Sequence, residues 1–136
     1  MSAVRVTGFD HLVLNVADVE RSLAFYVGVL GLAPVRVDAW RAGEVPFPSV
    51  RIDQGTIIDL VRGPRGESNV DHLCLVVAPI DWREVVGSGI FTVDEGPVPR
   101  FGARGTGQSI YVRDPDGNVV ELRHYPQDAR GAVRRG

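Results

Sequence analysis

The stretch FDHLVLNV (9–16) is apolar at Leu12, Val13, Leu14 and Val16, which predicts a buried strand at about 8–16. The spacing then changes to that of a helix, which we expect at about 18–30. Asp18 is a suitable N-cap for this helix, and Gly31 a suitable stop. The apolar stripe of the helix is formed by Val19, Leu23, Tyr26 and Leu30.

Shorter apolar runs predict the remaining elements. In the first half we expect strands near 33–37, 48–53 and 56–62. In the second half we expect a strand at 70–77, a helix near 81–87 and strands near 91–95, 108–113 and 118–125. RGPRGES (62–68) is rich in turn formers and predicts a linker, and Asp114-Pro115-Asp116-Gly117 predicts a tight turn.

The two halves repeat one pattern. FDHLVLNV and VDHLCLVV place His11 and His72 in register, 61 residues apart, and TIIDLVR and NVVELRH place Asp59 and Glu121 62 residues apart. Two matches at nearly one period indicate tandem β-α-β-β-β modules, at about 1–64 and 65–136. Because a module of this size buries little surface alone, we expect a single domain with one shared core.

Composition narrows the function. The 136 residues carry a formal net charge of −2, which gives no indication of a nucleic-acid or membrane partner. All fifteen basic residues are Arg, so Schiff-base chemistry on lysine is excluded. One cysteine, Cys74, no signal peptide and no long apolar run together predict a cytoplasmic protein.

The repeated polar residues suit a metal. Strand periodicity places each His opposite its preceding Asp and opposite the Leu pair, and it places each carboxylate opposite its apolar neighbours. If the modules pack symmetrically, two imidazoles and one or two carboxylates converge in one cleft. Such a donor set binds one divalent ion, Fe, Mn, Ni, Zn or Co, and leaves positions open for a substrate.

The stretches at 10–32, 70–77 and 109–125 resemble the vicinal oxygen chelate superfamily, which includes glyoxalase I, bleomycin-resistance proteins and extradiol dioxygenases. The stretch at 95–122 is similar to a glyoxalase-domain subgroup of unassigned reaction. The resemblance implies an α+β fold in which two tandem βαβββ modules form one curved mixed sheet that lines a metal cleft.

By this resemblance, His11, His72 and Glu121 match the metal ligands. Asp59 stands where glyoxalase I carries a fourth ligand, a Glu; because Asp is one methylene shorter, we expect a base or a supporting residue. Tyr111 is a candidate hydrogen-bond donor to substrate oxygen, with core packing as the alternative. The three candidate catalytic residues are Asp59, Glu121 and Tyr111.

Other residues have plainer interpretations. Cys74 is expected to be a buried inert thiol, and His124 a surface or packing residue. The Gly-rich stretch GPVPRFGARGTG (96–107) predicts a solvated loop, with a lid that carries Arg100 or Arg104 as the alternative. Trp40 and Phe47 are candidates for the pocket wall or for a dimer interface. The tail at 127–136 is a candidate for a segment held by a neighbouring chain.

Four functions remain open: a glyoxalase-like lyase or isomerase, with Asp59 or Glu121 as base; an Fe(II) ring-cleaving dioxygenase; a fosfomycin-type thiol transferase; and a non-enzymatic drug-binding protein. The absence of lysine disfavours the transferase, and the retained ligands disfavour the drug-binding protein. We therefore expect a metal-dependent enzyme of glyoxalase or dioxygenase type that acts on a small molecule, and a homodimer that pairs through exposed sheet edges.

Overall fold

The computed structural model describes residues 3–64, 66, 69–113 and 117–128. The first half comprises β1 (Val6–Val16), α1 (Val19–Leu23), the π-helix η1 (Ala24–Val29), β2 (Ala33–Val35), α2 (Val37–Arg41), β3 (Ser49–Asp53) and β4 (Thr56–Arg62). The second half comprises β5 (Val70–Val77), α3 (Trp82–Gly87), β6 (Val93–Gly102), β7 (Gly105–Arg113) and β8 (Val119–His124). The predicted turn at 114–117 and the tail beyond 128 lie largely outside the described residues.

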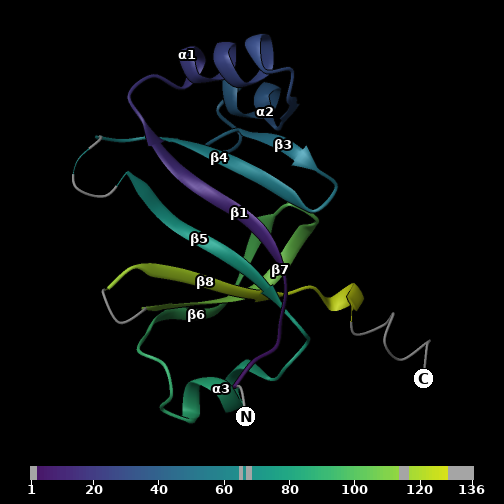
Figure 1. Cartoon of the computed structure of the whole chain (residues 1–136), viewed down its shortest axis with the longest axis vertical. Coiled ribbons are helices and arrows are strands. Elements are labelled where there is room, and N and C mark those ends of the chain that lie inside the picture. Colours follow the sequence, from purple (N-terminus) through teal and green to yellow (C-terminus); the bar gives the residue numbers. More distant parts are fainter. Residues whose placement is uncertain (1–2, 65, 67–68, 114–116, 129–136) are drawn as a thin grey trace.

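One curved sheet unites the two halves. In the described part of the chain its eight strands run in the order β2-β3-β4-β1-β5-β8-β7-β6, and the halves join where β1 pairs with β5. The pairs β1–β4 and β5–β8 are parallel and the other pairs antiparallel, so the sheet is mixed. Figure 1 shows the strands following one another around this curve. The predicted α+β fold with a curved mixed sheet is confirmed.

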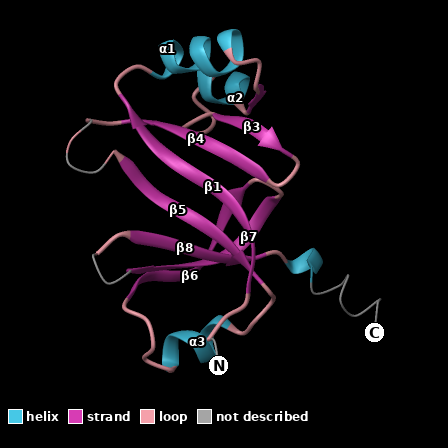
Figure 2. Cartoon of the chain, in the orientation of Figure 1, coloured by secondary structure: helices cyan, strands magenta, loops and turns pink. Residues whose placement is uncertain are grey.

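The helices lie at opposite ends of the molecule and cover the outer face of the sheet (Figure 2). α1 and α2 contribute Val19, Leu23 and Val37 to an apolar cluster with Val50 and Leu60. α3 contributes Trp82 and Val85 to a second cluster with Val77, Ile110, Val112 and Leu122. Each half therefore has its own core, and the prediction of one shared core is wrong. The inner face is left free for polar groups.

The predicted helix at 18–30 begins as expected, with the Asp18 side chain accepting a hydrogen bond from the Arg21 N–H. Its second part is a π-helix, whose wider turns shift the later residues around the axis. Leu30, expected on the apolar stripe, is consequently 54 % exposed. The helix α2 was not predicted; its residues continue directly from a strand that ends at Val35, two residues earlier than expected.

The Gly-rich stretch at 96–107 is not a loop, so the prediction of a solvated loop is wrong, while the lid that carries Arg100 stays a prediction. It forms most of a hairpin in which β6 and β7 pair as far as Gly102 and Gly105. A Cβ on Gly102 would overlap the Arg123 guanidinium, and a Cβ on Gly107 would lie 3.0 Å from the His124 carbonyl oxygen. These glycines allow close approach of strands. None of the described helices is long and apolar enough to cross a membrane.

Candidate metal centre and substrate pocket

Two β-bulges at the β1–β5 junction shape the centre. Phe9 pairs with Leu75 and His11 with Cys74, so Asp10 is an extra residue on β1. Val13 pairs with His72 and Leu14 with Val70, so Asp71 is an extra residue on β5. A bulge redirects the side chain of its extra residue. Strict alternation therefore fails at both Asp residues, which were expected on the face opposite the histidines.

Each redirected Asp binds the histidine that follows it. His11 Nδ1 lies 2.7 Å from Asp10 Oδ1, and His72 Nδ1 lies 2.7 Å from Asp71 Oδ2. A carboxylate on Nδ1 fixes the orientation of the imidazole and leaves Nε2 as the atom that faces a ligand. The two rings meet edge to face with centroids 5.5 Å apart. Both Nε2 atoms therefore face the same point on the inner side of the sheet.

Glu121 of β8 completes the cluster. Its Oε1 lies 3.3 Å from His11 Nε2 and 3.1 Å from His72 Nε2. Among the described residues, these three side chains offer ligand atoms that all lie within 4.8 Å of one another. The structure thus brings together the three predicted metal ligands. A second group, Asp10, His11 and Cys74, shares His11 and lies behind it. Burial raises the pKa of Cys74 to about 11, well above neutrality.

Buried side chains that the sequence analysis did not identify hydrogen-bond to the cluster or to Asp10: Ser109, Arg123 and Tyr125. Glu121 Oε2 accepts hydrogen bonds from Ser109 Oγ at 2.8 Å and from Arg123 Nη2 at 2.5 Å. Asp10 accepts from the Tyr125 hydroxyl and from the Ala103 N–H. Arg123 and Tyr125 follow Glu121 at intervals of two, so strand periodicity carried a signal that could have revealed them.

Electrostatics favour ionised groups in this network. Burial opposes ionisation of Glu121, but hydrogen bonds with His11 and His72 and the charge of Arg123 outweigh it, so the pKa of Glu121 lies well below its ordinary value. The pKa of Asp10 is also lowered: hydrogen bonds with His11 and Tyr125 outweigh burial. Burial lowers the pKa of His11, but bonds to Asp10, Cys74 and Glu121 raise it to about 12, and a divalent ion bound at Nε2 would have to replace the proton there.

Asp59 of β4 lies beside the cluster without joining it. Its Oδ2 is 3.7 Å from His11 Nε2, and its Oδ1 accepts a 2.5 Å hydrogen bond from Ser49 Oγ. Burial raises the pKa of Asp59 despite the opposing charge of His11 and the bond from Ser49. Equivalent strand positions thus give two carboxyl groups whose pKa values are shifted in opposite directions.

These groups line a cavity of about 430 Å³, a volume within the range of small-molecule sites. Tyr111 lies on its wall, with its ring 5.5 Å from that of His72, and Phe47 and Arg100 line it as well. Burial raises the pKa of Tyr111, so its hydroxyl keeps its proton and can donate.

Four other candidates lie away from this cavity. Trp40 packs against the cluster of the first half, and Arg104 forms an ion pair with Asp128. His124 packs against Trp82 on the outer face, at a centroid distance of 5.6 Å, and Cys74 is fully buried. The packing interpretation of His124 and the buried thiol at Cys74 are confirmed.

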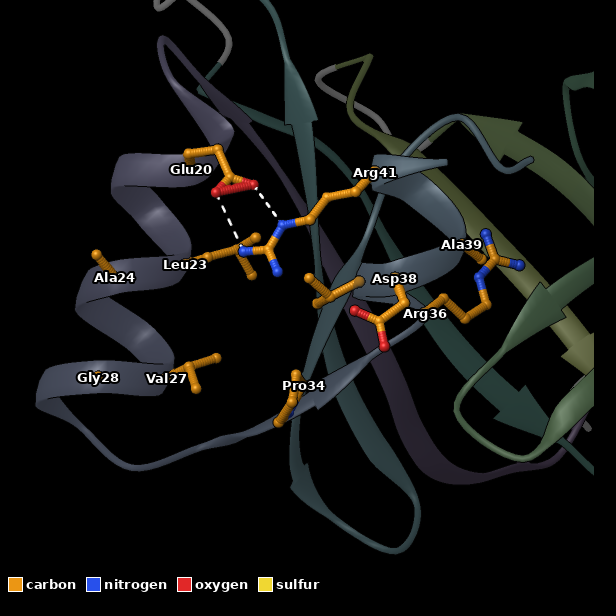
Figure 3. Close-up of a pocket in the computed structure, with 11 residues that line it drawn as sticks. Glu20, Leu23, Ala24, Val27, Gly28, Pro34, Arg36, Asp38, Ala39 and Arg41 are labelled. Carbon is orange, nitrogen blue, oxygen red and sulfur yellow. Dashed lines mark hydrogen bonds and ion pairs between the residues drawn. The ribbon is translucent and has the colours of Figure 1, made fainter. Parts of the chain in front are cut away.

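A separate groove of about 560 Å³ lies between α1–η1 and α2 (Figure 3). Leu23, Val27 and Pro34 give it an apolar floor, and Glu20 and Arg41 bridge it with two hydrogen bonds. The histidines and carboxylates of the cluster do not line this groove. Its described lining residues offer no donor set for a metal, and they share only Arg36 with the lining of the polar cavity.

Comparisons with known proteins agree with this architecture. The family model described as "Glyoxalase/Bleomycin resistance protein/Dioxygenase superfamily" matches residues 8–122. Virulence protein STM3117 of Salmonella typhimurium is 36 % identical over 120 residues, covering 85 % of this chain and 83 % of that protein. A probable lactoylglutathione lyase of Vibrio parahaemolyticus is 28 % identical over 134 residues, covering 89 % and 93 %.

A solved structure shares the fold. The Mn(II)-bound glyoxalase from Novosphingobium aromaticivorans superposes with a TM-score of 0.65 at 23 % sequence identity. The match covers 89 % of this chain and 40 % of that one.

Proposed function

Because the chain belongs to the glyoxalase/bleomycin resistance protein/dioxygenase superfamily, we propose that it is a divalent-metal-dependent enzyme acting on a small molecule through two neighbouring oxygens. Of the reactions in this superfamily, a glyoxalase-like lyase or isomerase reaction is preferred. The superfamily also includes resistance proteins without enzymatic activity, so the proposal rests on the site of this chain and not on the family alone.

One observation carries the proposal: His11 Nε2, His72 Nε2 and Glu121 Oε1 converge from three strands, with both imidazoles oriented by an Asp at Nδ1. Two nitrogens and one oxygen are a donor set that suits Fe, Mn, Ni, Zn or Co, and the second bond to each histidine matches the support that metal-binding imidazoles receive. A divalent ion held there would act as a Lewis acid on two neighbouring substrate oxygens.

The remaining residues then have separate tasks. Asp59 is the proposed base, because its raised pKa lies closer to neutrality than that of an ordinary carboxyl, and a base works best near the operating pH. Glu121 is a poorer base, since its pKa is strongly lowered, and it serves as a ligand. Tyr111, which lines the cavity, is the proposed hydrogen-bond donor to a substrate oxygen.

The second candidate is an Fe(II) extradiol-type dioxygenase. It is favoured by Asp59, which lies outside the cluster and leaves three ligands with an open side. It is disfavoured by the position of the third histidine: His124 packs on the outer face, so none of the histidines described in the structure is left to move protons near the open side. A non-enzymatic drug-binding role is the third candidate, disfavoured by the retained donor set.

The proposal is tested by metal analysis of protein purified without added metal. We expect about one divalent ion per chain, and we expect the triple change of His11, His72 and Glu121 to Ala to lose it while circular dichroism stays unchanged. His124→Ala is the matched control, since it removes the one histidine outside the cluster. Unchanged metal content in the triple variant would refute the assignment.

Assays with two substrates then distinguish the lyase from the dioxygenase. Turnover of a hemithioacetal with nickel, zinc or cobalt would establish the lyase. Iron together with oxygen uptake on a catechol would replace it with the dioxygenase. Metal binding with neither activity would favour a different substrate of the same chelating kind.

A further inference from the structure

Arg36 has an unusual backbone for its residue type. It precedes α2 with φ of 59°, in the left-handed region, and it is the sole non-glycine residue with positive φ in the described part of the chain. This conformation costs free energy in a residue with a Cβ, and such costs concentrate at binding and catalytic sites. The conformation starts a helix on one side and directs a long cationic side chain to the other.

The guanidinium of Arg36 reaches the polar cavity. Figure 3 shows its side chain extending away from the groove that contains Leu23 and Val27. Cζ lies 4.0 Å from the centroid of the Phe101 ring and 5.6 Å from that of Phe47. Arg36, Phe47 and Phe101 all line the cavity that contains the metal cluster. The two aromatic rings thus hold the Arg36 guanidinium in the wall of the pocket. Arg36 is far in the sequence from the three candidate metal ligands.

The hydrogen-bond donors of Arg36 are poorly used. Nη2 makes one long contact, 3.5 Å, to the carbonyl oxygen of Phe47, and Nε is buried without a hydrogen-bond partner. A buried donor left without a partner is costly and calls for an explanation. An oxygen-bearing group in the cavity would supply the acceptor.

The other charged groups in the wall are already paired. Arg100 binds Glu95 at 2.6 Å, Asp71 binds His72, and Glu121 binds Arg123. Among the described residues, Arg36 makes no ion pair with a carboxylate within 4.0 Å. It is therefore the cation of this pocket whose charge is still available to a ligand.

We propose that Arg36 determines specificity in this pocket by binding an anionic group, a carboxylate or a phosphate, on the substrate. The proposal rests on the proposed function, in which two neighbouring oxygens of that substrate lie on the metal. The planar guanidinium presents paired N–H donors that match either anion, and its hydrogen bond from Nη2 to the Phe47 carbonyl oxygen is long, at 3.5 Å. The substrate class is thus an acid that also carries a chelating oxygen pair.

The probes are hydroxamates, which chelate through two neighbouring oxygens. Acetohydroxamate has no anionic group; the monohydroxamates of malonate, succinate and glutarate carry a carboxylate at increasing distance; and phosphonoacetohydroxamate carries a phosphonate. Affinities are measured by calorimetry on the Mn(II)-loaded protein. We expect at least one anionic probe to bind about tenfold or more tighter than acetohydroxamate, about 1.4 kcal/mol. A carboxylate or a phosphonate preference identifies the anion.

Two variants decide the role of Arg36. Arg36→Met keeps the apolar contact with Phe101, and we expect it to lose the anionic advantage while binding of acetohydroxamate changes less than about twofold. Arg41→Met removes the same charge from α2 on the groove side and should keep the advantage. The proposal is overturned if the advantage survives in Arg36→Met, or if none of the anionic probes shows one.

Failure of the two proposals is distinguishable. If manganese does not bind, the proposed function fails, and the anion site is then measured in metal-free protein with glutarate and inorganic phosphate. Binding there that Arg36→Met abolishes would still support the anion site. Absence of such binding would overturn it independently.

Discussion

At the scale of single residues, Asp59 and Glu121 show how surroundings divide two carboxyl groups. Both accept a hydrogen bond from a serine, Ser49 or Ser109. Arg123 then contacts Glu121 at 2.5 Å, and both histidines approach the same carboxylate within 3.3 Å. Asp59 Oδ2 lies farther from His11 Nε2, at 3.7 Å, and burial keeps the pKa of Asp59 raised. Equivalent positions in the two halves of the chain can therefore supply a metal ligand in one half and a base in the other.

Asp59→Ala should leave the metal bound and slow turnover by about 10²–10⁴, the usual contribution of a general base. The reason is geometric: Oδ2 is 3.7 Å from His11 Nε2, outside the cluster of three ligand atoms. Metal titration and steady-state kinetics on the same preparation separate the two effects. A metal affinity that falls in Asp59→Ala and returns in Asp59→Glu would show instead that residue 59 is a ligand.

At the scale of elements, the bulges on β1 and β5 each insert one Asp before a histidine, but the two Asp side chains differ in burial. The Asp10 side chain is fully buried and is also held by Tyr125 and Ala103, whereas the Asp71 side chain is 57 % exposed. His11 is consequently fixed on more sides than His72. A solvated carboxylate orients an imidazole less firmly than a buried one.

Asp10→Asn should weaken metal binding by about 10–100-fold, the range observed when the partner of a metal-binding histidine is removed. Asp71→Asn makes the same chemical change at the exposed bulge and should weaken binding less. Competition titrations with a metal indicator measure both. Equal losses in the two variants would mean that burial does not distinguish the bulges.

The elements also show where sequence is sufficient. Alternation over β1, β4, β5 and β8 placed His11, Asp59, His72 and Glu121 on one face, because a strand of regular pleat obeys period two. It failed at Asp10 and Asp71, since a bulge is set by pairing with a partner strand. It failed again over β6, where Gly102 reflects contact with Arg123 twenty-one residues later. Arg36 could not be assigned for the same reason: its contacts with Phe101 arise between distant segments.

At the scale of the whole molecule, the homodimer stays a prediction, and the edge strands give a reason to expect its interface away from the sheet edges. The edge strands β2 and β6 contain Pro34, Pro97 and Pro99, which have no N–H to extend the sheet. A different apolar surface lies on η1 and at its end. Its exposed side chains are Phe25, Val29 and Leu30, with 49 %, 72 % and 54 % of their surface accessible.

We therefore predict a homodimer that pairs through η1 in sedimentation experiments at micromolar concentration. Changing Val29 and Leu30 together to Asp should produce a monomer, because it places charge in an apolar interface. Ile90→Asp, at another exposed apolar position, should leave the dimer intact. A monomeric wild-type protein would contradict the prediction.

The unequal support beneath the repeated carboxyl groups bears on the history of the chain. Arg123 and Tyr125 follow Glu121, and at the same intervals after Asp59 stand Val61 and Gly63. A half-length ancestor that paired with its own copy would have carried two identical carboxylates around one ion. In a tandem repeat the two halves are free to differ, and here one half has an arginine and a tyrosine where the other has a valine and a glycine. The proposed division between Glu121 as ligand and Asp59 as base needs such a difference, because two identical halves would shift the pKa values of both carboxyl groups alike.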